Sequence, residues 1–131
     1  MSYRINILEK TKANNYFREV LFTGSKSQLV VMCINPNEDI GEETHAHVEQ
    51  TLFNFSGNGK VVLDGVESEF NPGDVVVVTP GTKHNFINTG TEKLKIYTIY
   101  SPANHIDHTI HQTKAIADAD YKDEEFGNQI K

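Results

Sequence analysis

The feature that most constrains this chain is a succession of short β-type segments, separated by turn residues, from about residue 16 to residue 102. The segments are rich in β-branched and aromatic residues, which favour strands. The predicted strands are residues 16–22, 29–34, 52–55, 60–63, 66–70, 75–78, 85–88 and 94–100. Many short strands at this spacing, with no helices between them, predict an all-β sandwich or barrel.

Turn chemistry supports individual strand boundaries. Asp64-Gly65 lies between two predicted strands, and both residues tolerate positive φ, so the pair predicts a tight hairpin. Pro80-Gly81 predicts another sharp turn further along the chain. The four consecutive valines at 75–78 predict a strand that is buried on both faces.

The length of 131 residues predicts a single domain over residues 1–131, with a barrel core at about 28–102 and a tail at 103–131. No internal repeat is visible, so we expect one barrel. No helix is predicted before the tail. Residues 113–125 are rich in alanine and charged residues and predict a short surface helix.

Charge and composition argue against several classes of partner. The formal net charge is -6, and an acidic surface repels nucleic-acid phosphates. No apolar run approaches the ~18 residues of a membrane span, and no signal-peptide pattern is apparent, so we expect a cytoplasmic protein that binds no membrane. The single cysteine, Cys33, lies in an apolar run, where we expect a buried, inert thiol.

Three histidines and a glutamine suggest a metal site. His45 and His47 are two residues apart, and on a strand such side chains point to the same face. Gln50 lies just beyond them, and His84 follows the Pro80-Gly81 turn, which aims it inward. Taken alone, the pair His45 and His47 is as consistent with two histidines on the protein surface as with a metal site. Together, these side chains offer the three or four ligands that a transition metal needs.

The same two segments resemble the cupin family. Its second motif is Gly, five residues, Pro-x-Gly-x-x-His, three residues and Asn, and Gly73, Gly81, His84 and Asn88 fall in that register. Its first motif is Gly, five residues, His-x-His, three or four residues, Glu, six residues and Gly. The resemblance covers about residues 28–102. It implies a jelly-roll (double-stranded β-helix) barrel of six to eight strands, open at one end, with a metal on inward-facing side chains.

The resemblance implies one divalent ion (Fe, Mn, Zn, Ni, Co or Cu) on His45, His47, His84 and Gln50. The sequence departs from the family pattern at Thr79, where the family has Pro, and in a short loop after His47. The strand also begins early relative to Gly41, so His47 is the least secure ligand. Counting back from Gly57 places Gln50 where the family has Glu, whereas strand alternation favours Glu49 as the alternative ligand.

Two functions follow from this resemblance. The first is a metalloenzyme of the dioxygenase, isomerase or lyase type that acts on a small molecule at an open coordination position. The alternative is a non-catalytic, metal-dependent protein that binds a sugar or an organic acid. A neutral Gln50 in place of Glu leaves the site one charge more positive, which favours anionic ligands. An enzyme needs further polar groups above the metal, and the candidates are Asn54, Asn88, Tyr97 and Tyr100.

The tail is similar to that of small stand-alone cupins often labelled by likeness to mannose-6-phosphate isomerase. His105, His108 and His111 recur every three residues in it. They could form a second metal site or a substrate clamp at the barrel mouth. A hydrogen-bonded tail packed across the barrel is the favoured interpretation.

The aromatic residues of the 52–55 strand suggest self-association. If Gln50 points to the metal, then Phe53 and Phe55 point outward and form an apolar patch. A homodimer is the commonest way to cover such a patch, and we therefore predict one. The alternative is that the chain's own strand at 16–22 covers it.

Overall fold

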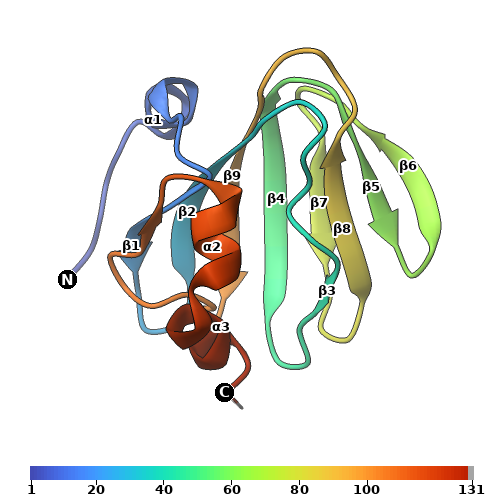
Figure 1. The fold of residues 1–131 in the computed structure, drawn as a ribbon. Helices are drawn as coiled ribbons and strands as arrows, with labels where there is room; N and C mark the ends of the chain where they lie inside the picture. Colours follow the sequence, from blue (N-terminus) through green and yellow to red (C-terminus); the bar gives the residue numbers. More distant parts are fainter. Residues whose placement is uncertain (130–131) are drawn as a thin grey trace.

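The computed structural model describes residues 1–129, which form two antiparallel β-sheets packed face to face, with short helices at both ends of the chain (Figure 1). The six-stranded sheet has the order β10-β1-β2-β9-β4-β7, and the four-stranded sheet has the order β3-β8-β5-β6. This confirms the predicted all-β jelly roll. The strands are β1 (Arg18–Thr23), β2 (Gln28–Ile34), β3 (Glu43–Thr44), β4 (Glu49–Ser56), β5 (Gly59–Leu63), β6 (Val66–Phe70), β7 (Val75–Val78), β8 (Lys83–Asn88), β9 (Leu94–Ser101) and β10 (Ile110–His111). The helices are α1 (Ile7–Ala13), α2 (Lys114–Ala119) and α3 (Tyr121–Gly127).

The core lies between the inner faces of the two sheets. Leu52 and Ile96 from the larger sheet and Val61 and Phe86 from the smaller sheet are almost completely buried. On β4 and β9 buried residues alternate with more exposed ones. Alternation of this kind fixes strand register, because a slip by one residue would expose every core side chain.

The Asp64-Gly65 hairpin forms as predicted. Leu63 pairs with Val66 across the turn, and Asp64 and Gly65 have φ values of 49° and 83°. Positive φ at both turn positions is the geometry whose twist matches that of the flanking strands. Gly81 also has positive φ, at 86°, in the predicted turn before β8.

The prediction for the four valines is wrong in one respect. They do form β7, but β7 pairs only with β4 and is an edge strand of the larger sheet. Val75 and Val77 are 52% and 51% exposed, while Val78 is buried. A run of consecutive apolar residues is typical of a strand that is buried on both faces. The side chains on both faces are buried, however, only where another layer covers each face.

Helix α1 was not predicted from the sequence. Its N-cap is Asn6, whose side-chain oxygen accepts a hydrogen bond from the backbone N–H of Glu9 at 3.1 Å. An Asn followed three residues later by Glu is a capping signal that was available in the sequence. The helix has only two turns, so its apolar periodicity is weak.

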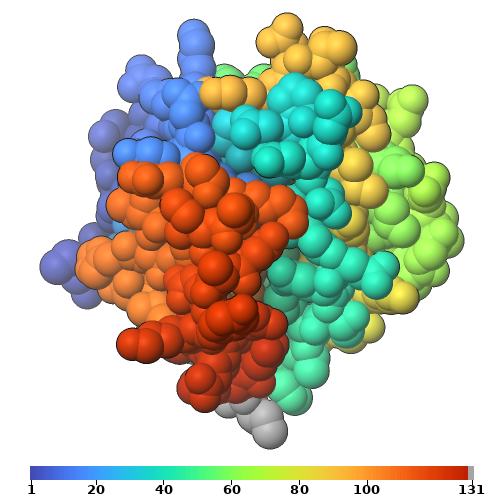
Figure 2. Space-filling model, viewed as in Figure 1, coloured from blue at the N-terminus to red at the C-terminus, as the bar shows by residue number. Residues whose placement is uncertain are grey.

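The tail forms two helices in place of the single helix predicted at 113–125. Asp120 ends α2 and caps α3, where its carboxylate accepts from the backbone N–H of Asp123 at 3.2 Å. The C-terminal helices lie beside the segment around residues 40–50 on one face of the molecule (Figure 2). Among the described residues, no helix has the length and apolarity needed to cross a membrane.

Candidate functional site

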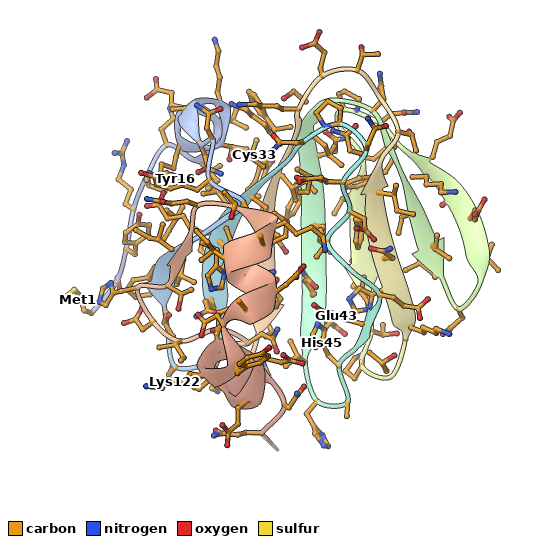
Figure 3. The ribbon with its side chains drawn as sticks, in the orientation of Figure 1. Met1, Tyr16, Cys33, Glu43, His45 and Lys122 are labelled. Carbon is orange, nitrogen blue, oxygen red and sulfur yellow. The ribbon has the colours of Figure 1, made fainter. Side chains whose placement is uncertain are left out.

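One cluster of potential metal ligands lies where β3 meets β8. The ligand atoms of Glu43, His45 and His84 all lie within 4.8 Å of one another. Glu43 is paired with His84 across the two strands, and His45 follows immediately after β3. The imidazole centroids of His45 and His84 are 5.2 Å apart, and Glu43 Oε2 lies 2.9 Å from His45 Nε2. Glu43 and His45 lie next to each other on this segment (Figure 3).

The turn before β8 fixes the tautomer of His84. Its Nδ1 lies 2.9 Å from the carbonyl oxygen of Thr82. A carbonyl oxygen only accepts, so Nδ1 carries the proton and Nε2 keeps a free lone pair. Burial lowers the pKa of His84, and the neighbouring His45 lowers it further. A neutral imidazole with a free Nε2 is the form that binds a metal.

Glu43 is ionised in this setting. Burial raises the pKa of its carboxyl group, but the hydrogen bond and the charge of His45 outweigh burial, so the pKa is lowered overall. The Glu43 side chain remains 41% exposed, whereas that of His45 is 11% exposed. The cluster therefore combines a carboxylate with two imidazoles, a donor set that suits a divalent transition metal.

The structure distinguishes Gln50 from Glu49. Gln50 is 4% exposed and faces the barrel interior, whereas Glu49 points to the exposed side of β4. The Gln50 amide nitrogen donates to Thr98 Oγ1 at 3.2 Å, and Thr98 donates in turn to the carbonyl oxygen of Thr51. The side-chain nitrogen of Gln50 thus has a partner, and the side-chain oxygen, Oε1, is the remaining polar atom of the amide. Ligation by either residue stays a prediction.

His47 lies outside the cluster and is exposed. Its predicted position rested on strand alternation, which requires an extended chain through His45 and His47. Strand β3 ends at Thr44, and the chain bends at residues 46–47 before β4 begins. The bend turns His47 outward, so the structure does not bring it together with His45 and His84.

Glu43 is the member of this cluster that sequence reasoning missed. The signal was present in the motif spacing. If Glu43-Thr44-His45 takes the place of His-x-His, four residues separate His45 from Gln50 and six separate Gln50 from Gly57. This register satisfies the spacing from His45 to Gly57 without a shortened loop, while Asn37 stands at the position of the motif's first Gly.

Comparison with known proteins identifies a family for this chain. Residues 30–100 match the family model described as a cupin domain. This chain belongs to the cupin family. The match covers β4 and β8, which are the strands of this cupin that carry Gln50 and His84.

The relatives of this cupin include proteins from bacteria and a virus. It is 42% identical over 119 residues to the uncharacterized protein YrkC of Bacillus subtilis (86% of this chain, 64% of the relative). It is 38% identical to the uncharacterized protein L612 of Acanthamoeba polyphaga mimivirus (79% of this chain, 67% of the relative). The chain thus spans about two-thirds of these curated relatives. The crystal structure of BH2720 from Bacillus halodurans is similar, with a TM-score of 0.89, 38% identity, and coverage of 91% of this chain and 95% of that one.

A cavity of about 430 Å³ adjoins the metal-ligand cluster. Glu43 and His45 line one side of it, and residues of α2 and α3 line the other. Arg18 of β1 and His105 of the tail, both buried, also line the cavity. Sequence reasoning missed Arg18, although a single arginine in the apolar 16–22 strand was a visible signal.

The tail histidines form the hydrogen-bonded arrangement that the sequence favoured. His105 Nδ1 lies 2.7 Å from Asp123 Oδ2, and His111 Nε2 lies 2.9 Å from Asp120 Oδ2. His108 has a side chain that is 89% exposed. His111, Asp120 and Asp123 lie close enough to hold a cation, but Arg18 Nη1 is 3.1 Å from His111 Nδ1 and already supplies a positive charge there.

Of the four polar candidates for groups above the metal, three have other roles. Asn54 and Asn88 donate to backbone carbonyl oxygens and brace the barrel loops. Tyr97 stacks on Phe53, with ring centroids 4.8 Å apart and planes 8° apart, on the outer face of the larger sheet. Tyr100 is buried and packs edge-on against His105, which lines the cavity.

Proposed function

We propose that this cupin binds one divalent metal ion through Glu43, His45 and His84, with the Gln50 carbonyl oxygen as a fourth ligand, and acts on a small molecule in the adjoining cavity. The observation that carries the proposal is the cavity itself, because Glu43 and His45 belong both to the ligand cluster and to the cavity wall. A molecule in the cavity therefore lies next to the metal-ligand cluster.

The chemistry of the donor set supports this assignment. A carboxylate, two imidazoles and an amide oxygen suit Mn, Fe, Co, Ni, Cu or Zn. A bound ion of this kind polarises an oxygen of the substrate, activates water or binds dioxygen. With Glu43 as a ligand, the site carries one more negative charge than the set of His45, His47, His84 and Gln50. The reason to expect an anionic ligand is thereby removed.

The residues of the chain prepare the cluster for a ligand. Thr82 orients His84 through Nδ1, and Glu43 holds His45 through Nε2 in the absence of an ion. Partners of this kind fix the direction of an imidazole and its tautomer. The low pKa of His84 keeps this imidazole neutral at physiological pH, so no proton competes with the metal there.

A second candidate function is binding without catalysis. The pKa values of His105, which lines the cavity, and of Tyr100, which packs against His105, favour it. Burial raises the pKa of Tyr100 to about 12, and burial lowers the pKa of His105 to about 4. A general acid or base works best with a pKa near the operating pH. Both pKa values lie far from neutral pH, so neither group is suited to transfer a proton in catalysis. A catalytic reaction in this cavity would therefore depend mainly on the metal site.

Metal analysis of the purified protein tests the proposal. We expect one divalent ion per chain in the wild type, its loss in His84→Ala, and its retention in His47→Ala. The matched control is His47 because it is a histidine of the same site region but exposed. Full metal content in His84→Ala would contradict the proposal, and loss of metal in His47→Ala would restore the ligand set expected from the family motif.

A further inference from the structure

Two residues of the cavity wall each carry a buried polar atom that has no hydrogen-bond partner within the described residues. Arg18 Nε and His105 Nε2 are buried and make no hydrogen bond, and each of the two residues is only 6% exposed. Both side chains line the cavity, as Glu43 and His45 do. Buried polar groups are nearly always paired, so an unpaired group that lines a cavity points to a ligand.

The two atoms make opposite demands on a ligand. The Arg18 guanidinium only donates, so Nε–H needs an acceptor. His105 Nδ1 donates to the Asp123 carboxylate at 2.7 Å. Its Nε2 is then the unprotonated nitrogen and needs a donor. A carboxylate ligand would satisfy Arg18 but would leave His105 without a donor.

The charge of the cavity wall disfavours an anion. Among the residues that line the cavity, Arg18 is the one cationic residue besides histidine. The carboxylates of Glu43 and Asp123 lie close enough to Arg18 to interact with its charge. Four further carboxylates, those of Glu42, Asp118, Asp120 and Glu124, line the cavity. Carboxylates in such numbers repel a negatively charged ligand and accept hydrogen bonds from a hydroxylated one.

A hydroxyl group meets both demands, because it donates and accepts without carrying charge. We propose that the cavity binds a neutral polyhydroxy compound, a polyol or a sugar, with hydroxyl groups that accept from Arg18 Nε and donate to His105 Nε2. A further hydroxyl then reaches the Glu43–His45–His84 cluster. The proposal rests on the proposed function in that last contact only, since Arg18 and His105 lie outside the ligand cluster. A cavity of about 430 Å³ has the size of a small-molecule site.

The test is a comparison of matched pairs that differ in one group. Xylitol, D-glucitol and D-mannitol are titrated against xylonate, D-gluconate and D-mannonate, with the wild-type protein in metal-loaded and metal-free form. Calorimetry measures each dissociation constant, and nitrogen-15 NMR follows the Arg18 Nε–H signal. We expect at least one polyol to bind about tenfold or more tightly than its acid and to shift that signal. Tighter binding of the acids, or no shift by any polyol up to about 0.1 M, would overturn the proposal.

A pair of histidine variants tests the role of His105. In His105→Asn the amide nitrogen keeps a donor for Asp123, while the acceptor at the Nε2 position is lost. We expect polyol affinity to fall about tenfold with unchanged metal content. His108→Asn, an exposed histidine of the same tail, is the control and should keep wild-type affinity. Wild-type affinity in folded His105→Asn contradicts the proposal, and if that variant does not fold, the Arg18 signal of the wild type decides.

Metal content and polyol binding are measured separately, so the two proposals fail separately. Polyol binding with an Arg18 shift in a protein that takes up no metal supports the cavity ligand and overturns the metal site. Metal uptake without polyol binding supports the metal site and overturns the proposed cavity ligand. Binding in both forms of the protein, tighter in the metal-loaded form, supports a hydroxyl at the ligand cluster.

Discussion

Glu43 on β3 lies directly opposite His84 on β8 in an antiparallel pair, with their side chains on the same face. The register of this short pair brings a carboxylate and an imidazole to one point, and His45 joins them one residue beyond the end of β3. Because β3 is only two residues long, the geometry depends on the pairing of two residues with β8.

We predict that Glu43→Gln lowers the affinity for a divalent ion by at least about tenfold, because the amide removes the only negative charge of the proposed ligand set. Glu42→Gln is the matched control, since Glu42 is the neighbouring residue and its carboxylate pairs with Lys83 at the surface. Zinc or manganese titrations followed by calorimetry measure the difference. Equal affinities in the two variants would show that Glu43 is not a ligand.

The His105–Asp123 pair predicts a loss of stability at acidic pH. Burial lowers the pKa of His105 to about 4, helped by the charge of Arg18, whereas an unfolded histidine titrates near ~6.5. Between these values the unfolded chain binds the extra proton, so the free energy of unfolding falls as pH drops below ~6.5 and the loss is complete near the folded pKa. The contribution is about 3 kcal/mol at most. The lowered pKa of Asp123 acts in the same direction at still lower pH.

Urea unfolding of the metal-free protein between pH 7 and pH 4.5 measures this slope. His84 also has a lowered pKa, so the contribution of His105 is the difference between the wild type and His105→Asn. We expect a smaller slope in His105→Asn and a wild-type slope in His108→Asn. A wild-type slope in both variants would mean that His105 is not neutral in the folded state.

Substitution of Gly65 in the Asp64-Gly65 turn should change the stability of the domain through backbone strain and not through packing. Gly65 has φ of 83°, and a β-carbon there would meet no atom within 4 Å. Gly65→Val should therefore destabilise the domain by about 1–3 kcal/mol through backbone strain alone. Gly65→Asn should cost much less, because asparagine tolerates this conformation. Thermal unfolding compares the two, and equal melting temperatures would exclude strain as the cause.

The outer face of the larger sheet supports the predicted homodimer. Val75 and Val77 on the edge strand β7 are about half exposed, and Thr51 and Phe53 pair with them on β4. Strand β1 pairs with β2 in the same sheet and so does not lie over this face. Light scattering should give about twice the chain mass of 14.7 kDa.

Single charges at exposed valines locate the interface. Val77→Lys should give a monomer, because the lysine would place a charge in the apolar contact. Val66→Lys is the control, since Val66 is also an exposed valine but lies on β6 in the other sheet. A monomeric wild type, or dissociation by Val66→Lys alone, would contradict a dimer through the β7 face.

The sequence by itself determined the positions of the predicted strands, the Asp64-Gly65 hairpin and the turn that aims His84. These features depend on local conformational preferences: β-branched and aromatic residues, residues that accept positive φ, and proline. The motif spacing counted back from Gly57 favoured Gln50 over Glu49 as the inward residue. Alternation along β4 then placed Phe53 on the opposite face from Gln50, as the structure has it.

Only the tertiary structure decided the composition of the candidate metal cluster. Glu43 joins His84 through the pairing of β3 with β8, and His47 turns away because the chain bends directly after His45. The exposure of Val75 and Val77 likewise follows from the outer face of the larger sheet, which is not covered at β7. The meeting of Arg18 and His105 at one cavity joins β1 to the tail. Contacts between distant segments depend on sheet order, which the free energy of the whole fold selects and no local pattern encodes.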